Sequence, residues 1–207
     1  MGKNLQIPIF ATMIAFLRGI FVYKSPALVH IETGGVGYEL QISLNTYSRI
    51  EHLESGMLLT YLHIREDAHI LYGFFDKGEK EMFIQLISVS GVGASTARMM
   101  LSSMKPEEIA RAIRDGNARQ LESIKGIGKK SAERIILELR DKVGKTKEDT
   151  INISSSPNNT LAQDALNALV TLGIARPAAE NAIKKIMNEG LGTDKIEDII
   201  KKALKIL

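Results

Sequence analysis

The sequence predicts an α+β protein of several domains: a small β-barrel, a helical domain, and a three-helix bundle on a flexible linker. Three observations predict it. Short strand-like runs fill the first part of the chain, a helical pattern with a Gly-x-Gly turn repeats in the middle, and a Ser/Pro/Asn-rich stretch precedes the last helices. The expected segments are an extension at 1–12, the barrel at 13–75, the helical domain at 76–143, the linker at 144–159 and the bundle at 160–207.

The composition excludes several classes of protein. The 207 residues include no cysteine, which rules out disulfides, thiolate metal sites and cysteine nucleophiles. No run of eighteen apolar residues is present, so we expect no membrane span and a cytoplasmic protein. Residues 76–142 carry 13 basic and 10 acidic side chains, whereas residues 13–75 carry four and six. The middle segment is therefore the one expected to face an anion.

Five runs rich in β-branched and aromatic residues lie in the first segment, separated by turn signals such as Thr33-Gly34-Gly35. They cover residues 20–23, 27–31, 38–42, 58–64 and 69–75. Five short strands at this spacing indicate a small barrel or an OB-like meander. Arg65, Glu66 and Asp67 lie between the last two runs and should form the tip of a hairpin, where charges are usually only solvated.

The middle segment contains an internal repeat with an offset of 35 residues. Residues 85–101 and 120–136 each read as an apolar helix, a Gly-apolar-Gly turn and a second helix. Two glycines allow positive φ and let a phosphate approach the backbone. The next helix begins with unpaired N–H groups and the positive end of its dipole. With Lys129 and Lys130 after the second turn, the pattern predicts a tandem helix-hairpin-helix site for DNA phosphates.

The candidate DNA-binding residues are those of the two turns and the helix starts that follow them. They are Gly91, Val92, Gly93, Ala94, Ser95, Arg98, Gly126, Ile127, Gly128, Lys129 and Lys130. The alternative is that each turn is only a tight connection between helices. This interpretation is weaker for two such turns in tandem than for one. The segment Gly128–Ser131 lacks the spacing of a Walker A loop, so ATP-driven work would come from another chain.

Catalytic, metal and cofactor sites are not expected. His63 and His69 flank the hairpin tip beside Glu66 and Asp67, which is the arrangement closest to a metal site. Histidines in strands are commonly only hydrogen-bonded, so we expect no metal there. No nucleophile and base with a telling spacing are present.

The last segment predicts three short helices. They cover Leu161–Leu172, a segment from Pro177 to Met187, and a segment from Asp194 or Lys195 to Leu207 with Thr193 as its cap. A bundle this small on a tether is suited to docking a partner. Leu172 and Ile174, near a turn, are the candidate docking residues; the alternative is that they fill the bundle's own core.

From Met13 onward the chain resembles the RuvA family, the Holliday-junction-binding subunits of bacterial branch-migration complexes. The matching stretches, in colinear order, are MIAFLRG at 13–19, LVHIETGGVGYEL at 28–40, REDAHILYGF at 65–74, SGVG at 90–93, KGIGKKSAERIILELRDK at 125–142 and, more weakly, ALVTLGI at 168–174. Residues 1–12 match nothing in the family. Many members have a lysine where this chain has Ser95, and we expect Arg98, one turn further on, to supply that charge.

The resemblance implies an OB-fold domain, a tandem helix-hairpin-helix domain and a tethered three-helix domain. It implies a homotetramer whose concave face holds an open four-way DNA junction. It places an acidic pin on Arg65, Glu66 and Asp67, whose carboxylates would repel phosphates near the crossover. The third domain is implied to dock on RuvB, the hexameric ATPase motor, and the resolvase RuvC is the other implied partner.

The expected function is therefore a non-catalytic, structure-specific DNA clamp. The alternative is a helix-hairpin-helix DNA-repair nuclease or lyase. Such an enzyme would need a catalytic acid cluster, or a Lys/Asp pair in a pocket, that the sequence does not show. An RNA-binding OB protein is a third class, which the low aromatic content of 5% disfavours.

Overall fold

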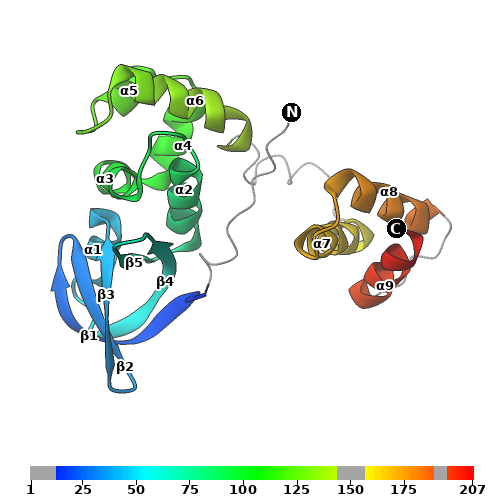
Figure 1. Ribbon diagram of the computed structural model, residues 1–207, viewed down its shortest axis with the longest axis horizontal. Coiled ribbons are helices and arrows are strands. Elements are labelled where there is room, and N and C mark those ends of the chain that lie inside the picture. Colours follow the sequence, from blue (N-terminus) through cyan, green and yellow to red (C-terminus); the bar gives the residue numbers. More distant parts are fainter. Residues whose placement is uncertain (1–12, 144–156, 189–194) are drawn as a thin grey trace. The chain divides into compact units, whose positions relative to one another are not determined.

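A computed structural model describes residues 13–143, 157–188 and 195–207 of the chain. They belong to two compact units, the first ending at Thr146 and the second beginning at Lys147. The first unit combines a β-barrel with helices, and the second contains helices only (Figure 1). None of the helices in the described ranges has the length and apolar character needed to cross a membrane.

Five strands form a closed barrel in the order β1-β2-β3-β5-β4. Their bounds are β1 (Phe16–Ser25), β2 (Leu28–Thr33), β3 (Val36–Ile42), β4 (Ser55–Ile64) and β5 (His69–Phe74). All neighbouring pairs are antiparallel except β3 and β5, which are parallel. This is the topology of an OB-fold, so the predicted fold class is confirmed.

Strands β1 to β4 are longer than the predicted runs, β5 is one residue shorter, and one helix of the barrel was not predicted. β1 begins at Phe16 because its first half pairs with β4 and its second half with β2. Helix α1 (Leu44–Ile50) connects β3 to β4. The side chain of Ser43 caps it by accepting a hydrogen bond from the Thr46 N–H at 3.1 Å.

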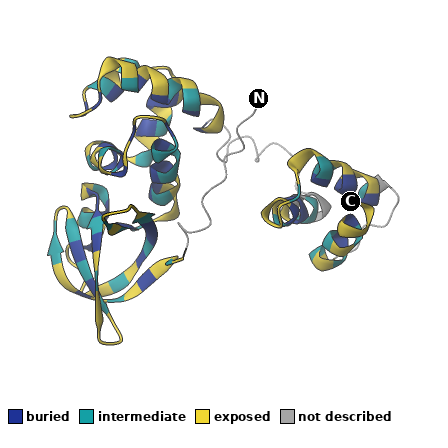
Figure 2. Ribbon diagram, in the orientation of Figure 1, coloured by how far each residue is buried: buried dark blue, intermediate teal, exposed yellow. Residues whose placement is uncertain are grey.

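Alternate residues of the strands fill the barrel, as the period of two requires (Figure 2). Val29, Ile31 and Leu40 have no exposed surface. Gly19 lies where β1 crosses the end of β2, and a Cβ atom there would lie 1.9 Å from the Glu32 carbonyl oxygen. Only glycine fits this crossing.

The variant Gly19→Ala is therefore expected to lower the free energy of unfolding by about 3 kcal/mol, because the strands must separate to admit the methyl group. Urea unfolding measures the change. Gly37→Ala is the matched control, since a Cβ atom at this strand position meets nothing within 4 Å. Equal stability of the two variants would show that the crossing at Gly19 is not tight.

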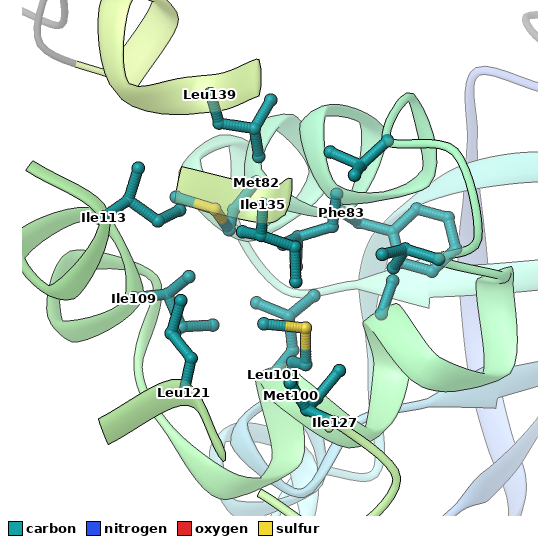
Figure 3. Packing of buried hydrophobic residues seen from close by; sticks show 14 of the residues in the cluster. Met82, Phe83, Met100, Leu101, Ile109, Ile113, Leu121, Ile127, Ile135 and Leu139 are labelled. Carbon is teal, nitrogen blue, oxygen red and sulfur yellow. The ribbon is translucent and has the colours of Figure 1, made fainter. Parts of the chain in front are cut away.

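Helices α2 to α6 form the rest of the first unit. Their bounds are α2 (Lys77–Ile87), α3 (Ala94–Ser103), α4 (Pro106–Arg114), α5 (Ala118–Glu122) and α6 (Lys129–Val143). Helices α2 and α3 form the first hairpin and α5 and α6 the second, as the repeat predicts, while α4, which was not predicted, joins them. Figure 3 shows Ile109 and Ile113 of α4 facing residues of both hairpins in one shared core.

This core continues onto the outer face of the barrel. The ring of Phe83 on α2 lies 5.5 Å from that of Tyr61, 5.0 Å from that of Tyr72 and 4.9 Å from that of Phe74, centroid to centroid. All four aromatic residues are buried. The helices and the β4–β5 hairpin are thus packed together.

A buried carboxylate also links the barrel to α2. Glu79 is 2% exposed and accepts hydrogen bonds from the hydroxyl groups of Ser43 and Thr46, at the start of α1. Burial raises the pKa of Glu79, although the two hydroxyl groups oppose that shift. Asn45 of α1 donates to the Met104 carbonyl at 3.1 Å, so α1 contacts the first hairpin as well.

The second unit contains α7 (Pro157–Thr171), α8 (Arg176–Asn188) and α9 (Ile196–Ile206), which share one apolar core. Gly173 ends α7 as predicted: its φ is +92°, and the next N–H, of Ile174, donates to the Leu169 carbonyl at 3.1 Å. Helix α7 begins at Pro157, inside the expected linker. The rest of that linker, the extension at 1–12 and the predicted cap Thr193 lie outside the described residues.

Candidate nucleic-acid interface

The two Gly-x-Gly turns have the same backbone structure. In the first, the Val92 N–H donates to the Val89 carbonyl at 3.0 Å, and in the second the Ile127 N–H donates to the Ile124 carbonyl at 3.0 Å. The middle apolar residue is 5% exposed in both turns. It anchors the turn in the core and leaves the flanking glycines at the surface.

The two glycines of each turn differ in their roles. Gly91 has a φ of +89° and Gly126 a φ of +91°, which favour glycine, whereas Gly93 has a φ of −84°. The positive φ that the sequence argument allowed for glycine is thus used by the first glycine of each turn and not by the second. A Cβ atom at Gly93 or Gly128 would meet nothing within 4 Å. Neither the backbone conformation nor the packing requires glycine at the second position of the turn. The lack of a side chain at this position leaves room for a group of a bound ligand.

That open space lies at the start of a helix. The first helical hydrogen bond of α3 runs from the Ala97 N–H to the Gly93 carbonyl at 2.9 Å, and that of α6 from the Ala132 N–H to the Gly128 carbonyl at 3.0 Å. A glycine at this position has no side chain that could cap the helix. The N–H groups of the first turn therefore remain available to an anion such as a phosphate.

The positive charge is uneven between the two hairpins. Lys129 and Lys130 are exposed in the first turn of α6. The equivalent residues of α3 are Ala94, which is buried, and Ser95, which is exposed. Arg98, expected to supply the missing charge, donates from Nη1 to the Ala27 carbonyl of the barrel at 2.9 Å. Arg98 therefore holds α3 against the barrel.

Arg134 connects the two hairpins and was not predicted. Its Nη1 donates to the Ser90 carbonyl in the first turn at 3.2 Å, and its Nε lies 3.7 Å from Glu138. A pocket of about 250 Å³ lies at this junction, lined by Ser90, Gly91, Lys130, Ser131 and Arg134. The first turn and the start of α6 thus share one surface. The spacing of Arg134 four residues after Lys130, on one helical face, was the available signal.

The predicted hairpin tip joins β4 to β5. The Arg65 N–H donates to the Ala68 carbonyl at 2.8 Å, which leaves Glu66 and Asp67 as the two exposed turn residues. In the described part of the chain, no cluster of three or more His, Asp or Glu side chains is placed to hold a metal ion. The tip presents carboxylates to solvent.

The two candidate docking residues of the second unit differ in exposure. Leu172 is 62% exposed just after α7. Ile174 is partly buried and packs against the core of the unit. Ile174 thus contributes to the bundle's own core, which was the alternative interpretation, while Leu172 is open to a partner.

An OB barrel joined to two helix-hairpin-helix turns with open helix starts defines a class: tandem helix-hairpin-helix proteins of the kind that contact nucleic-acid backbones. Comparison with known families agrees. Residues 13–73 match the RuvA N terminal domain, residues 83–141 the SAM-like Helix-hairpin-helix tandem, and residues 160–207 the RuvA, C-terminal domain.

Individual relatives extend this agreement over nearly the whole chain. The chain is 47% identical over 195 residues to the Holliday junction branch migration complex subunit RuvA of Christiangramia forsetii. It is 42% identical over 198 residues to the subunit of the same name from Cytophaga hutchinsonii. Each alignment covers 94% of this chain and 100% of the relative. The chain belongs to the RuvA family.

Proposed function

We propose that this protein binds four-way (Holliday) DNA junctions as a homotetramer and holds them open for branch migration in recombination and DNA repair. The observation that carries the proposal is the pair of matching turns, each with an uncapped helix start and an open glycine, on one surface. Backbone amides and lysines contact phosphates without reading bases. Shape then supplies the specificity, because four arms that engage four subunits multiply weak contacts.

The acidic pin is the second feature by which the proposed tetramer acts on the junction. Glu66 and Asp67 are exposed at the end of a hairpin that is packed against the helical core. Four such tips near a common axis would form a patch of negative charge. That patch repels phosphates from the centre of the junction and guides the strands toward new pairings.

The second unit docks the motor in this proposal. Its exposed Leu172 is the contact assigned to a hexameric RuvB-type ATPase, with Ile174 supporting the turn from the core of the unit, and a RuvC-type resolvase is the other partner. The protein itself is a non-catalytic subunit that acts in the cytoplasm, with no cofactor or metal. The alternative of a helix-hairpin-helix nuclease or lyase predicts strand cleavage by the purified protein with Mg²⁺.

Mass measurement of the complex on a synthetic four-way junction tests the assembly. The expected result is four chains on each junction, or eight when two tetramers enclose it. Linear duplex of the same length should not yield this ratio, since it offers only two arms. A complex with one or two chains per junction would contradict the tetrameric clamp.

A further inference from the structure

His63 lies two residues before the acidic pin and belongs to a row of side chains that leads to it. Tyr61 and His63 alternate on the outer face of β4 (Ser55–Ile64), and Arg65 follows directly after the strand. The His63 ring lies 6.3 Å from the Tyr61 ring and 6.3 Å from the Tyr72 ring, centroid to centroid. Both tyrosines pack against Phe83 of α2. The imidazole is therefore held at the end of a buried aromatic cluster.

The imidazole holds the arginine of the pin. Nε of Arg65 donates to Nε2 of His63 at 3.0 Å. An imidazole nitrogen that accepts a hydrogen bond carries no proton, so the ring is neutral in this arrangement. Among the described residues, Arg65 forms no ion pair with Glu66 or Asp67, although it precedes them directly in the chain. The guanidinium is turned back along the strand, and neither carboxylate is paired with it.

The Arg65 guanidinium has two possible partners, the His63 imidazole or a carboxylate of the pin, and the free energies of the two arrangements are close. An exposed ion pair with Glu66 or Asp67 is weak, because water screens it and long side chains lose freedom in forming it. A single hydrogen bond to an ordered imidazole is therefore enough to decide where the guanidinium lies. Removal of that acceptor leaves the neighbouring carboxylates as the nearest partners.

We propose that His63 is a positioning residue that keeps Arg65 away from Glu66 and Asp67, so that the acidic pin retains its full negative charge. This inference rests on the proposed function, in which that charge repels phosphates at the centre of the junction. Without the acceptor on His63, Arg65 turns toward one of the carboxylates and offsets part of the negative charge of the pin.

Protonation of His63 has the same consequence as its removal. The titratable groups around the ring are Tyr61 on its own strand, Arg65 directly after that strand and Tyr72 on β5. Lys80 is the half-buried cation of α2, the helix packed on both strands, and burial lowers its pKa. Burial, and then the charge of Arg65, lower the pKa of His63 below 6.5. The hydrogen bond is thus intact at neutral pH and is lost as the pH falls through that lowered pKa.

The first test needs no DNA. Carbon-13 NMR titration of the full-length protein measures the carboxyl pKa of Glu66 and of Asp67. In His63→Val at least one of them is expected to fall by about half a unit, because Arg65 becomes its partner. His63→Gln, whose amide oxygen still accepts, should keep the wild-type values, as should His63→Val combined with Arg65→Met. Unchanged carboxyl pKa values in His63→Val would overturn the positioning role.

The second test measures DNA binding. His63→Val is expected to bind linear duplex about two- to fivefold more tightly than wild type, the range that one exposed charge interaction produces. Wild type should approach this result as the pH falls through the lowered pKa of His63, and His63→Gln should bind as wild type does at pH 7.5 and respond less to acid. If neither the wild type nor any variant prefers junctions over duplex, the proposed function is refuted. The carboxyl pKa values would then still decide whether His63 positions Arg65.

Discussion

Replacing Lys129 and Lys130 by alanine is expected to weaken the binding of four-way junctions by about a thousandfold. The two lysines are exposed in the first turn of α6, beside an uncapped helix start. A tetramer would present eight of them to one junction. Even about 0.5 kcal/mol for each exposed contact gives about 4 kcal/mol in total. Binding to linear duplex should weaken too, because the contacts are made to phosphates.

The salt dependence identifies the lost contacts as phosphate contacts. The slope of log affinity against log salt should become less steep by about 0.9 for each contact removed. Lys184→Ala with Lys185→Ala is the matched control, since this exposed pair on α8 carries the same charge and lies in the other unit. Unchanged affinity and slope in the Lys129/Lys130 variant would mean that the second hairpin is not the phosphate site.

Replacing Glu66 by glutamine and Asp67 by asparagine should reduce the preference for junctions, by about tenfold or more, without loss of junction binding. In the proposed tetramer the change would remove eight negative charges from the centre of the complex. Linear duplex, which those charges repel, should bind more tightly, and the junction should bind as well as before or better. Titration of both DNA forms at fixed salt measures the ratio.

A control variant distinguishes the effect of the pin on DNA binding from the effect of the protein's net charge. Glu51→Gln with Glu54→Gln removes the same charge from exposed residues that precede β4, at the end of the strand away from the tip. This variant should keep the wild-type preference. Loss of junction binding in the Glu66/Asp67 variant would contradict the repulsive role of the pin.

The elements with a clear period were the predictable part of the fold. Strand-like runs bounded by turn signals identified the barrel, and the 35-residue repeat identified both hairpins. Helix α1 escaped prediction because its seven residues are too few to show a period and its cap, Ser43, also bonds a distant carboxylate. Helix α4 lies between the two copies of the repeat and belongs to neither.

The candidate site was predictable where the signal is local and not where it depends on tertiary contacts. The turns, Lys129 and Lys130 follow from adjacent residues. Arg98 was expected to face DNA, but its partner in the structure is Ala27, 71 residues earlier. Arg134 reaches Ser90 across 44 residues. A single sequence contains no direct sign of such distant pairings.

Competition between junction and duplex tests the central claim most directly. A labelled synthetic four-way junction is bound by the wild-type protein and challenged with a large excess of unlabelled linear duplex of the same arm sequence, at fixed salt. The account predicts that the junction complex survives, because the shape of the junction lets all four subunits engage DNA at once. Displacement of the junction by duplex would contradict it and leave a general DNA-backbone binder.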